Sequence, residues 1–244
     1  MSLKGKTALV TGAGRGIGKV IASNLAEMGC KIAVNDLPNS RDIANTISEF
    51  KSSGYEAESF LFSVTDLNSV KNGIQSIEQK WGPVDILVNN AGITSQDKFA
   101  DIALERWNLI VNVNLNGSIY CAHAVLPQMV ARNSGVIINM SSILATRVQY
   151  SVAYGTTKAA LERFTTGLAR ELRRTNVSVS CLKPFFVKTE VVTGFLDGKT
   201  DMTDWEEPEM WGKYTAMIAN ADPQITTGKI FDQALLKQTL GPWQ

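Results

Sequence analysis

The chain has 244 residues, of which 44% are hydrophobic and 19% charged, and its formal net charge is +1. This composition is typical of a globular protein and argues against nucleic acid or an anionic membrane as the main partner. Cys30, Cys121 and Cys181 lie far apart in apolar surroundings, so we expect buried thiols and no disulfide or metal site. We find no apolar run near the ~20 residues that span a bilayer and no secretory signal, and we expect a cytoplasmic protein.

Short β-branched runs alternate with longer amphipathic stretches along the chain. Strands are expected at residues 7–10, 31–35, 57–62, 86–88, 136–140 and 177–182. Helices are expected at residues 17–28, 41–53, 67–81, 104–131 and 152–174. The alternation predicts an α/β doubly wound Rossmann fold, a parallel sheet with helices on both faces. The sequence contains no repeat and no linker, and we therefore expect one domain over residues 1–244. The pattern lapses at residues 192–211, and such a long loop is typically functional.

The first expected strand leads into a glycine-rich turn, and a helix follows. Gly12 permits a tight turn, Gly16 lets the backbone approach a pyrophosphate, and Gly18 lets the helix pack closely on the strand. The free N–H groups of the helix would then face the phosphates. A glycine-rich turn alone could be an ordinary loop. Its place at the first strand–helix junction predicts a dinucleotide-binding site.

Two charged residues bear on which dinucleotide binds. Asp36 ends the second strand, 24 residues after Gly12, where a carboxylate can bond the adenosine ribose hydroxyls and repel a 2′-phosphate. Arg15 favours the opposite choice, because a cation in the glycine turn could pair with that phosphate. We weight Asp36 more heavily and expect NAD, with NADP possible. Asp36 could instead be a helix-capping or turn residue before Pro38.

Tyr154 and Lys158 stand four residues apart at the start of an expected helix, so they share one face. A phenol with a pKa near 10 is a poor base at neutral pH. A neighbouring ammonium and a positive nicotinamide ring would lower that pKa. The pair alone could be an ordinary surface pair. Together with the glycine turn it predicts a nicotinamide-dependent oxidoreductase.

With these motifs the chain resembles the short-chain dehydrogenase/reductase family over residues 5 to about 190. The further matching segments are Asn89-Asn90-Ala91-Gly92, Trp107-x6-Asn114-Leu115-x-Gly117, Ser141-Ser142 and Pro184-x-x-Val187-x-Thr189. The resemblance implies the catalytic set Asn114, Ser142, Tyr154 and Lys158. It implies cofactor contacts from Gly12, Arg15, Gly16, Ile17, Gly18, Asp36, Ser63, Val64, Asn90, Ala91, Gly92, Tyr154, Lys158, Val187 and Thr189.

The resemblance also implies a mechanism. The Ser142 and Tyr154 hydroxyls would bond the substrate oxygen, and Tyr154 would give or take the proton. Lys158 would bond the nicotinamide ribose and lower the pKa of the tyrosine. Asn114 would hold a relay water through kinked helix backbone, although it could also be a buried Asn bonded to its own backbone. The family further implies a homo-oligomer, a dimer or tetramer, with the helices at 104–131 and 152–174 as candidate interfaces.

The catalytic segment departs from the family pattern in its spacing. Eleven residues separate Ser142 from Tyr154, whereas many family members have one more. Either the loop is shortened or Ser141 takes the catalytic place. Strand alternation puts the two hydroxyls on opposite faces and favours Ser142.

Three further positions depart from the pattern. Ser63 stands where Asp or Asn usually bonds adenine, so that contact is expected to be weaker. Phe185 replaces the common glycine after Pro184, and a bulky residue there could re-route the backbone because φ > 0 is unfavourable for it. Residues 227–232 are similar to the family's last strand but lack its Asp-Gly-Gly, which puts the usual C-terminal packing and tetramer contact in doubt.

The substrate segment is expected at about residues 190–215. Its acidic residues outnumber its lysines: Asp197, Asp201, Asp204, Glu206, Glu207 and Glu209 against Lys199 and Lys213. They would disfavour highly anionic substrates, or they could form a solvated helix face. An apolar set could line a substrate pocket or belong to the core: Phe185, Phe186, Phe195, Trp205, Met210, Trp211 and Met217. Arg147, Gln149 and Tyr150 could also reach the substrate, and we expect a neutral or moderately apolar alcohol or ketone.

The leading hypothesis is an NAD(H)-dependent oxidoreductase acting on a secondary alcohol or ketone. The first alternative is an NADPH-dependent 3-oxoacyl-carrier-protein reductase, and the second is a cofactor-binding regulator without catalysis, which the intact catalytic set argues against. His123, the one histidine, is expected in the core or an interface, so we expect no metal site. Arg132, Arg173 and Arg174 would complement helix dipoles or meet an acidic carrier protein.

Overall fold

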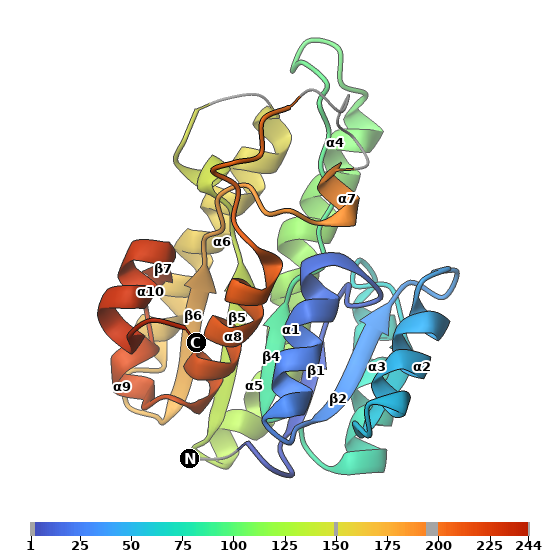
Figure 1. The fold of residues 1–244 in the computed structure, drawn as a ribbon, viewed down its shortest axis with the longest axis vertical. Coiled ribbons are helices and arrows are strands. Elements are labelled where there is room, and N and C mark those ends of the chain that lie inside the picture. Colours follow the sequence, from blue (N-terminus) through green and yellow to red (C-terminus); the bar gives the residue numbers. More distant parts are fainter. Residues whose placement is uncertain (1–2, 149–150, 194–199, 244) are drawn as a thin grey trace.

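The computed structural model describes residues 3–148, 151–193 and 200–243 (Figure 1). Within these residues, seven parallel strands form one sheet in the order β3-β2-β1-β4-β5-β6-β7. The strands are β1 (Thr7–Val10), β2 (Lys31–Asp36), β3 (Ala57–Leu61), β4 (Ile86–Asn89), β5 (Gly135–Met140), β6 (Val177–Leu182) and β7 (Ile230–Phe231). The strand order reverses between β1 and β4, and such a reversal opens a crevice at the carboxyl ends of the strands.

The strands follow the apolar runs of the sequence. Every residue of β1, β4 and β6 is buried, as expected for a sheet covered on both faces. Ala8 lies between Ile32 of β2 and Ile86 of β4 in the register of the central strands. The predicted doubly wound Rossmann fold is confirmed, with strand ends shifted by at most one residue. The segment at 227–232 does form the last strand, β7, although it is short.

Helices cover both faces of this sheet (Figure 1). They are α1 (Gly16–Glu27), α2 (Ile43–Ser52), α3 (Leu67–Trp81), α4 (Leu104–Val111), α5 (Gly117–Ala131), α6 (Val152–Glu171), α7 (Glu190–Thr193), α8 (Pro208–Asn220), α9 (Pro223–Thr226) and α10 (Gln233–Leu240). The core on one face joins α1 to α8 and contains Trp211 and Tyr214, both fully buried. The core on the other face joins α3, α5 and α6 through residues such as Ile77, Val125 and Met129.

The helical stretch Leu104–Ala131 runs from α4 through a π-helical turn (Asn112–Asn116) into α5. Its 28 residues include a window of mean hydropathy 1.3, so length and composition alone would let it cross a membrane. The sequence-based expectation that no such stretch exists was therefore wrong. Cys121, Val125 and Met129 pack into the core beside the sheet, and a core helix meets the same criterion.

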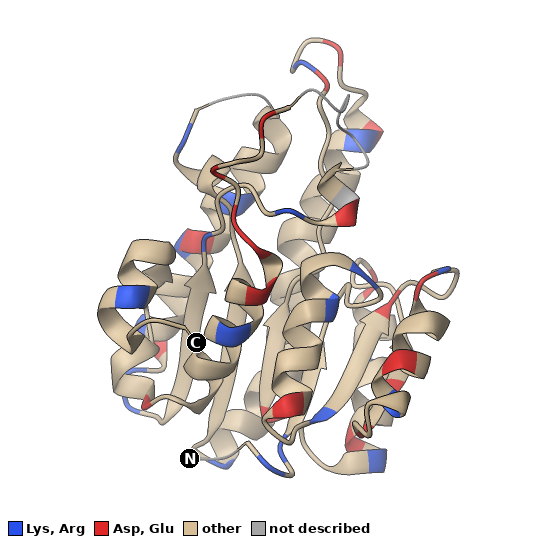
Figure 2. Ribbon diagram, viewed as in Figure 1, with Lys and Arg blue, Asp and Glu red and all other residues tan. Residues whose placement is uncertain are grey.

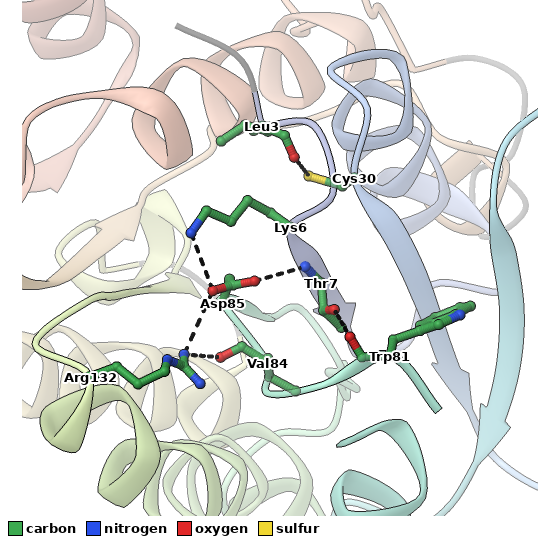
Figure 3. A network of polar contacts seen from close by, with 8 residues as sticks. All are labelled: Leu3, Lys6, Thr7, Cys30, Trp81, Val84, Asp85 and Arg132. Carbon is green, nitrogen blue, oxygen red and sulfur yellow. Dashed lines mark hydrogen bonds and ion pairs between the residues drawn. The ribbon is translucent and has the colours of Figure 1, made fainter. Parts of the chain in front are cut away.

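A polar network ties the amino-terminal ends of the central strands together (Figure 3). Asp85 accepts a hydrogen bond from Thr7 N at 3.0 Å, and its other oxygen lies 3.4 Å from Lys6 Nζ and 3.7 Å from Arg132 Nη2. Arg132 also donates to the Val84 carbonyl at 3.1 Å. Arg132 therefore holds the end of α5 to the start of β4, at the amino-terminal ends of the strands and opposite the crevice.

Charges of both signs are scattered over the described surface (Figure 2). The three cysteines are buried, as predicted. Burial raises the pKa of Cys30, Cys121 and Cys181 to about 12 each, which keeps these thiols protonated and unreactive.

Candidate active site

A cleft of ≈ 570 Å³ opens at the carboxyl ends of the strands, where the topology predicts a binding site. It extends from Asp36 beside β2 to Val192 in α7. The cleft brings together these predicted site residues: Gly12, Arg15, Gly16, Ile17, Gly18, Asp36, Ser63, Val64, Asn90, Ala91, Gly92, Ser142, Tyr154, Lys158, Val187 and Thr189. Asn114 is the one predicted site residue that does not line it.

The glycine turn is bonded to the turn that follows β4. Gly12 has φ +62°, and a Cβ there would lie 2.9 Å from the Ala91 Cα. A Cβ on Gly18 would collide with the Asn90 amide, which donates to the carbonyls of Thr11 and Gly12 at 2.9 and 3.0 Å. The absent side chains keep the two turns close and leave backbone N–H groups facing the cleft. A dinucleotide diphosphate fits this arrangement.

The Asp36 carboxylate lies over the glycine turn. It accepts hydrogen bonds from Leu37 N at 2.8 Å and Ser40 Oγ at 3.0 Å, so Asp36 is a turn residue as well as a cleft residue. A Cβ on Gly14 would collide with the carboxylate, a requirement that the sequence analysis missed. Arg15 forms an ion pair of 3.5 Å with Asp42, and these two side chains are 58% and 45% exposed.

The expected adenine side of the cleft has Ser63 and Val64. Ser63 Oγ lies 2.8 Å from Thr65 Oγ1 and accepts the Thr65 N–H at 3.3 Å. Val64 is buried, and a Cβ on Gly117 would lie 2.7 Å from its Cγ2. The Ser63 hydroxyl thus shapes the turn, and Ser63 is also one of the residues that line the cleft.

The two neighbouring serines after β5 point in different directions. Ser142 Oγ hydrogen-bonds the Tyr154 hydroxyl and accepts the Leu144 N–H at 3.2 Å. Ser141 Oγ donates instead to Glu162 Oε1 at 2.8 Å. The geometry therefore brings Ser142, and not Ser141, to the tyrosine. Of the intervening loop, residues 149 and 150 lie outside the described residues.

Burial controls the ionisation of the Tyr154–Lys158 pair. Lys158 is 3% exposed, its Nζ donates to the Met140 carbonyl at 2.6 Å, and burial lowers its pKa to about 8. Nζ lies 5.4 Å from the centroid of the Tyr154 ring. Burial raises the pKa of Tyr154, and the bond with Ser142 opposes that rise. The lowering of the tyrosine pKa expected from Lys158 together with a positive nicotinamide ring stays a prediction, because burial and the Ser142 bond are the causes of the Tyr154 shift in the chain alone.

Asn114 lies in the π-helical turn between α4 and α5 and is fully buried. Its Oδ1 accepts the Ile93 N–H at 2.8 Å, and its Nδ2 donates to the Ile93 carbonyl at 2.9 Å and to Thr157 Oγ1 at 3.1 Å. The helix is irregular at the expected place, since Asn112–Asn116 form this π-helical turn. A Cβ on Gly92 would lie 3.5 Å from Asn114 Oδ1 and 3.6 Å from Lys158 Nζ. Asn114 thus sits beside the lysine and holds the wall of the cleft.

The segment after β6 is fixed by Glu206. Its carboxylate accepts hydrogen bonds from Phe185 N at 2.8 Å and the Trp211 indole N–H at 3.1 Å. Among the non-glycine residues that the structure describes, only Asn133 and Ser151 have positive φ, so Phe185 replaces glycine without that strain. The chain here pairs across a bridge between Val187 and Glu206. Burial raises the pKa of Glu206, and its carboxylate holds the segment after β6 in place.

The predicted apolar set divides between pocket and core. Phe185 contacts Phe186 edge to face with centroids 4.8 Å apart, and Phe186 stacks on Trp205 at 5.1 Å. The Arg147 guanidinium lies 5.6 Å from the Phe185 centroid. Core residues from the set are Met210 and Trp211, with Met217 packed against them. Phe195, Asp197, Lys199, Gln149 and Tyr150 lie outside the described residues.

The acids of the substrate segment are partly engaged with neighbouring groups. Glu207 pairs with Lys188 at 2.7 Å, and Asp201 Oδ1 accepts from Thr203 N at 2.9 Å and Thr203 Oγ1 at 2.6 Å. The ion pair with Lys188 offsets the charge of Glu207 and so reduces the repulsion that we expected the segment to exert on an anion.

Two cleft contacts were missed by sequence reasoning. Glu190 Oε1 accepts the Gly16 N–H at 2.8 Å, and no motif marked it. Ser151, immediately before α6, has φ +65°, is buried, and lies with Oγ 3.4 Å from Thr94 Oγ1. Both residues of that pair line the cleft. The signal for Ser151 was its place as an N-cap residue before the tyrosine helix.

The histidine prediction is corrected in part. His123 is exposed on α5 and lines a shallow depression against α3, so it is not a core residue. Over residues 3–148, 151–193 and 200–243, no group of three or more His, Cys, Asp or Glu side chains could hold a metal ion.

Comparison with known proteins agrees with this geometry. Residues 6–199 match the model of the short chain dehydrogenase family. Gluconate 5-dehydrogenase of Gluconobacter oxydans (strain 621H) is 32% identical over 90% of this chain and 87% of its own length. A 3-oxoacyl-[acyl-carrier-protein] reductase of Staphylococcus epidermidis (strain ATCC 12228 / FDA PCI 1200) is 36% identical over 80% of this chain and 81% of its own. A gluconate 5-dehydrogenase from Burkholderia cenocepacia J2315, solved with NADP and tartrate, has a TM-score of 0.85 and 30% identity over 94% of each chain. The chain belongs to the short-chain dehydrogenase family and is an NAD(P)-dependent oxidoreductase acting on alcohol or ketone groups.

Proposed function

We propose that this cleft transfers a hydride between NAD(H) and a secondary alcohol or ketone, with Tyr154 as the proton donor in reduction and acceptor in oxidation. The observation that carries the proposal is the bond between the Tyr154 and Ser142 hydroxyls beside the buried Lys158. Two hydroxyls at one point can hold a carbonyl or alcohol oxygen and fix the carbon that reacts. The nicotinamide supplies the hydride chemistry when bound.

Lys158 is proposed to support the proton transfer. Its pKa of about 8 leaves most of the ammonium charged at pH 7, and that charge favours phenolate in Tyr154. Asn114 fixes the chain at Ile93 and thereby the wall beside the ammonium. In this proposal Asn114 also helps to relay protons from Lys158 to solvent through the kinked π-helical turn.

We propose NAD as the preferred cofactor because the Asp36 carboxylate is held in place at the cleft. Two hydrogen bonds fix it, so a 2′-phosphate would meet a charge that cannot easily move away. Parallel titrations of the protein with NAD and NADP test the preference. Tighter binding of NADP by tenfold would show that Asp36 does not control the choice.

A second candidate is an NADPH-dependent 3-oxoacyl-carrier-protein reductase. It is favoured by the similarity to the staphylococcal reductase and by the neighbour solved with NADP. Among the residues that the structure describes, the ion partner of Arg15 is Asp42; such exposed pairs contribute little, so this cation can turn toward a 2′-phosphate. The cofactor titration separates this candidate from the first.

The substrate end of the cleft combines two kinds of surface. Thr94, Ser95 and Ser151 are polar lining residues of the cleft, and Phe185 and Phe186 add apolar surface to its lining. We propose a secondary alcohol or ketone that carries polar groups on one side of the reacting carbon. A panel of sugar acids, 3-oxoacyl thioesters and simple ketones, followed at the nicotinamide absorbance band with each cofactor, tests this. Turnover of the simple ketones alone would contradict the polar side of the proposal.

A further inference from the structure

The side chain of Glu190 reaches back to the start of α1. Its Oε1 accepts the N–H of Gly16, the first residue of α1, at 2.8 Å. Gly16 lines the cleft and has φ +58°. Glu190 comes from α7, 174 residues further along the chain, and α7 lies beyond the upper end of α1 in Figure 1. An exposed carboxylate therefore occupies a donor inside the cofactor cleft.

This donor is one that an anion would use. The first N–H groups of a helix have no partner within the helix, and the helix dipole adds about half a positive charge there. A carboxylate and a phosphate oxygen are the same kind of acceptor for such a group. The Gly16 N–H cannot make a full hydrogen bond to both at once, so a dinucleotide diphosphate in this turn has to displace Glu190 or share the donor with it.

The residue before Glu190 is also engaged in α7. Thr189 Oγ1 accepts the Val192 N–H at 3.4 Å, and the Thr189 carbonyl accepts the Thr193 N–H at 2.8 Å. Thr189 is buried and lines the cleft, and it is one of the residues that the family resemblance implies as a cofactor contact. Two adjacent residues thus make contacts that would change when a dinucleotide fills the cleft.

We propose that Glu190 is an internal anion that competes with the cofactor diphosphate for the Gly16 N–H and so lowers the affinity of the chain for its cofactor. This inference rests on the proposed function, because it requires the diphosphate at the glycine turn. It adds a residue that sets cofactor affinity without touching the reacting atoms. A weaker hold on the cofactor would favour its release after each turnover.

The test compares ligands with and without a diphosphate by isothermal titration calorimetry. The full chain is titrated with ADP-ribose and with adenosine, as wild type, Glu190→Gln and Glu190→Ala. Glu209→Gln removes a charge from an exposed acid in the first turn of α8 and is the matched control. Both Glu190 variants are expected to bind ADP-ribose about 3- to 30-fold more tightly, the range of a charge at a helix N-terminus, with adenosine and the control unchanged.

Three results would overturn the inference. Unchanged or weaker ADP-ribose binding in both Glu190 variants would show that the carboxylate does not compete with the diphosphate. An equal gain for adenosine would show that the effect is not directed at the diphosphate. If neither the wild type nor the variants bind ADP-ribose, the cofactor site itself is wrong, and that failure of the proposed function is distinct from the other two.

Discussion

Replacing Lys158 with Met is expected to change how the stability of the chain depends on pH. Burial lowers the pKa of this lysine from 10.5 to about 8. At about 1.4 kcal/mol per pKa unit, this difference disfavours the folded state by about 3 kcal/mol at neutral pH. The lost hydrogen bond to the Met140 carbonyl, worth about 1–3 kcal/mol, offsets much of the gain from removing the charge. The variant is therefore expected to be as stable as the wild type near pH 7, or slightly more stable.

The difference in unfolding free energy between the wild type and Lys158→Met is expected to depend on pH. Because the folded pKa lies below the unfolded one, the unfolded chain binds more protons between pH 8 and 10.5, and the contribution of Lys158 to stability rises with pH in that window. The two pKa values give the wild type a gain of about 1.3 kcal/mol over Lys158→Met between pH 7 and pH 9. Cys30 and Cys121 lower the stability of both proteins as the pH approaches and passes 9, because burial raises their pKa values, and they therefore leave the difference between the two proteins unchanged.

Urea unfolding at pH 7, 8 and 9 measures this difference directly. Lys71→Met, a change at an exposed lysine of α3, controls for the loss of a cation. A constant difference between the wild type and Lys158→Met across this range would refute the argument that burial depresses the pKa of Lys158 in the folded chain.

Three further predictions concern the cleft. Ser142→Ala is expected to lower kcat by about 10²- to 10³-fold, as for loss of one oxyanion donor, whereas Ser141→Ala should change it only a few-fold. Steady-state kinetics in which Ser141→Ala has the larger effect would contradict the assignment of Ser142. Gly14→Ala is expected to weaken NAD binding by about tenfold, because the added Cβ would displace the Asp36 carboxylate. An unchanged affinity for NAD in a fluorescence titration would show that this carboxylate does not contact the cofactor. Glu206→Ala is expected to lower the free energy of unfolding by about 2 kcal/mol, because it leaves the N–H groups of Phe185 and the Trp211 indole without their acceptor. An unchanged midpoint in urea unfolding would contradict that loss of stability.

The sequence predicts the fold well because its signals are local. The apolar strands and the glycine turn depend on runs of a few residues, and the strand 177–182 agrees with β6 at both ends. The sequence also allowed a choice between Ser141 and Ser142, since successive side chains of a strand point to opposite faces of the sheet. The geometry then shows Ser142 at the tyrosine.

Contacts between distant segments were not accessible in the same way. Nothing near Glu190 in the sequence marks a bond to Gly16, which lies 174 residues earlier. The acid at 206 was taken as surface charge, because only the packed structure shows that it binds the backbone at Phe185. The rise that burial gives the Tyr154 pKa in the chain alone was not foreseen either, since composition gives no measure of how completely a side chain is desolvated.

The variant Tyr154→Phe tests directly whether Tyr154 exchanges the proton of an alcohol or ketone in this cleft. The variant keeps the ring and removes only the hydroxyl that meets Ser142. With a substrate identified from the panel, turnover and cofactor affinity are measured side by side for wild type and variant. Turnover is expected to be lost in Tyr154→Phe while the cofactor dissociation constant stays nearly unchanged. Turnover that persists in Tyr154→Phe would contradict this expectation.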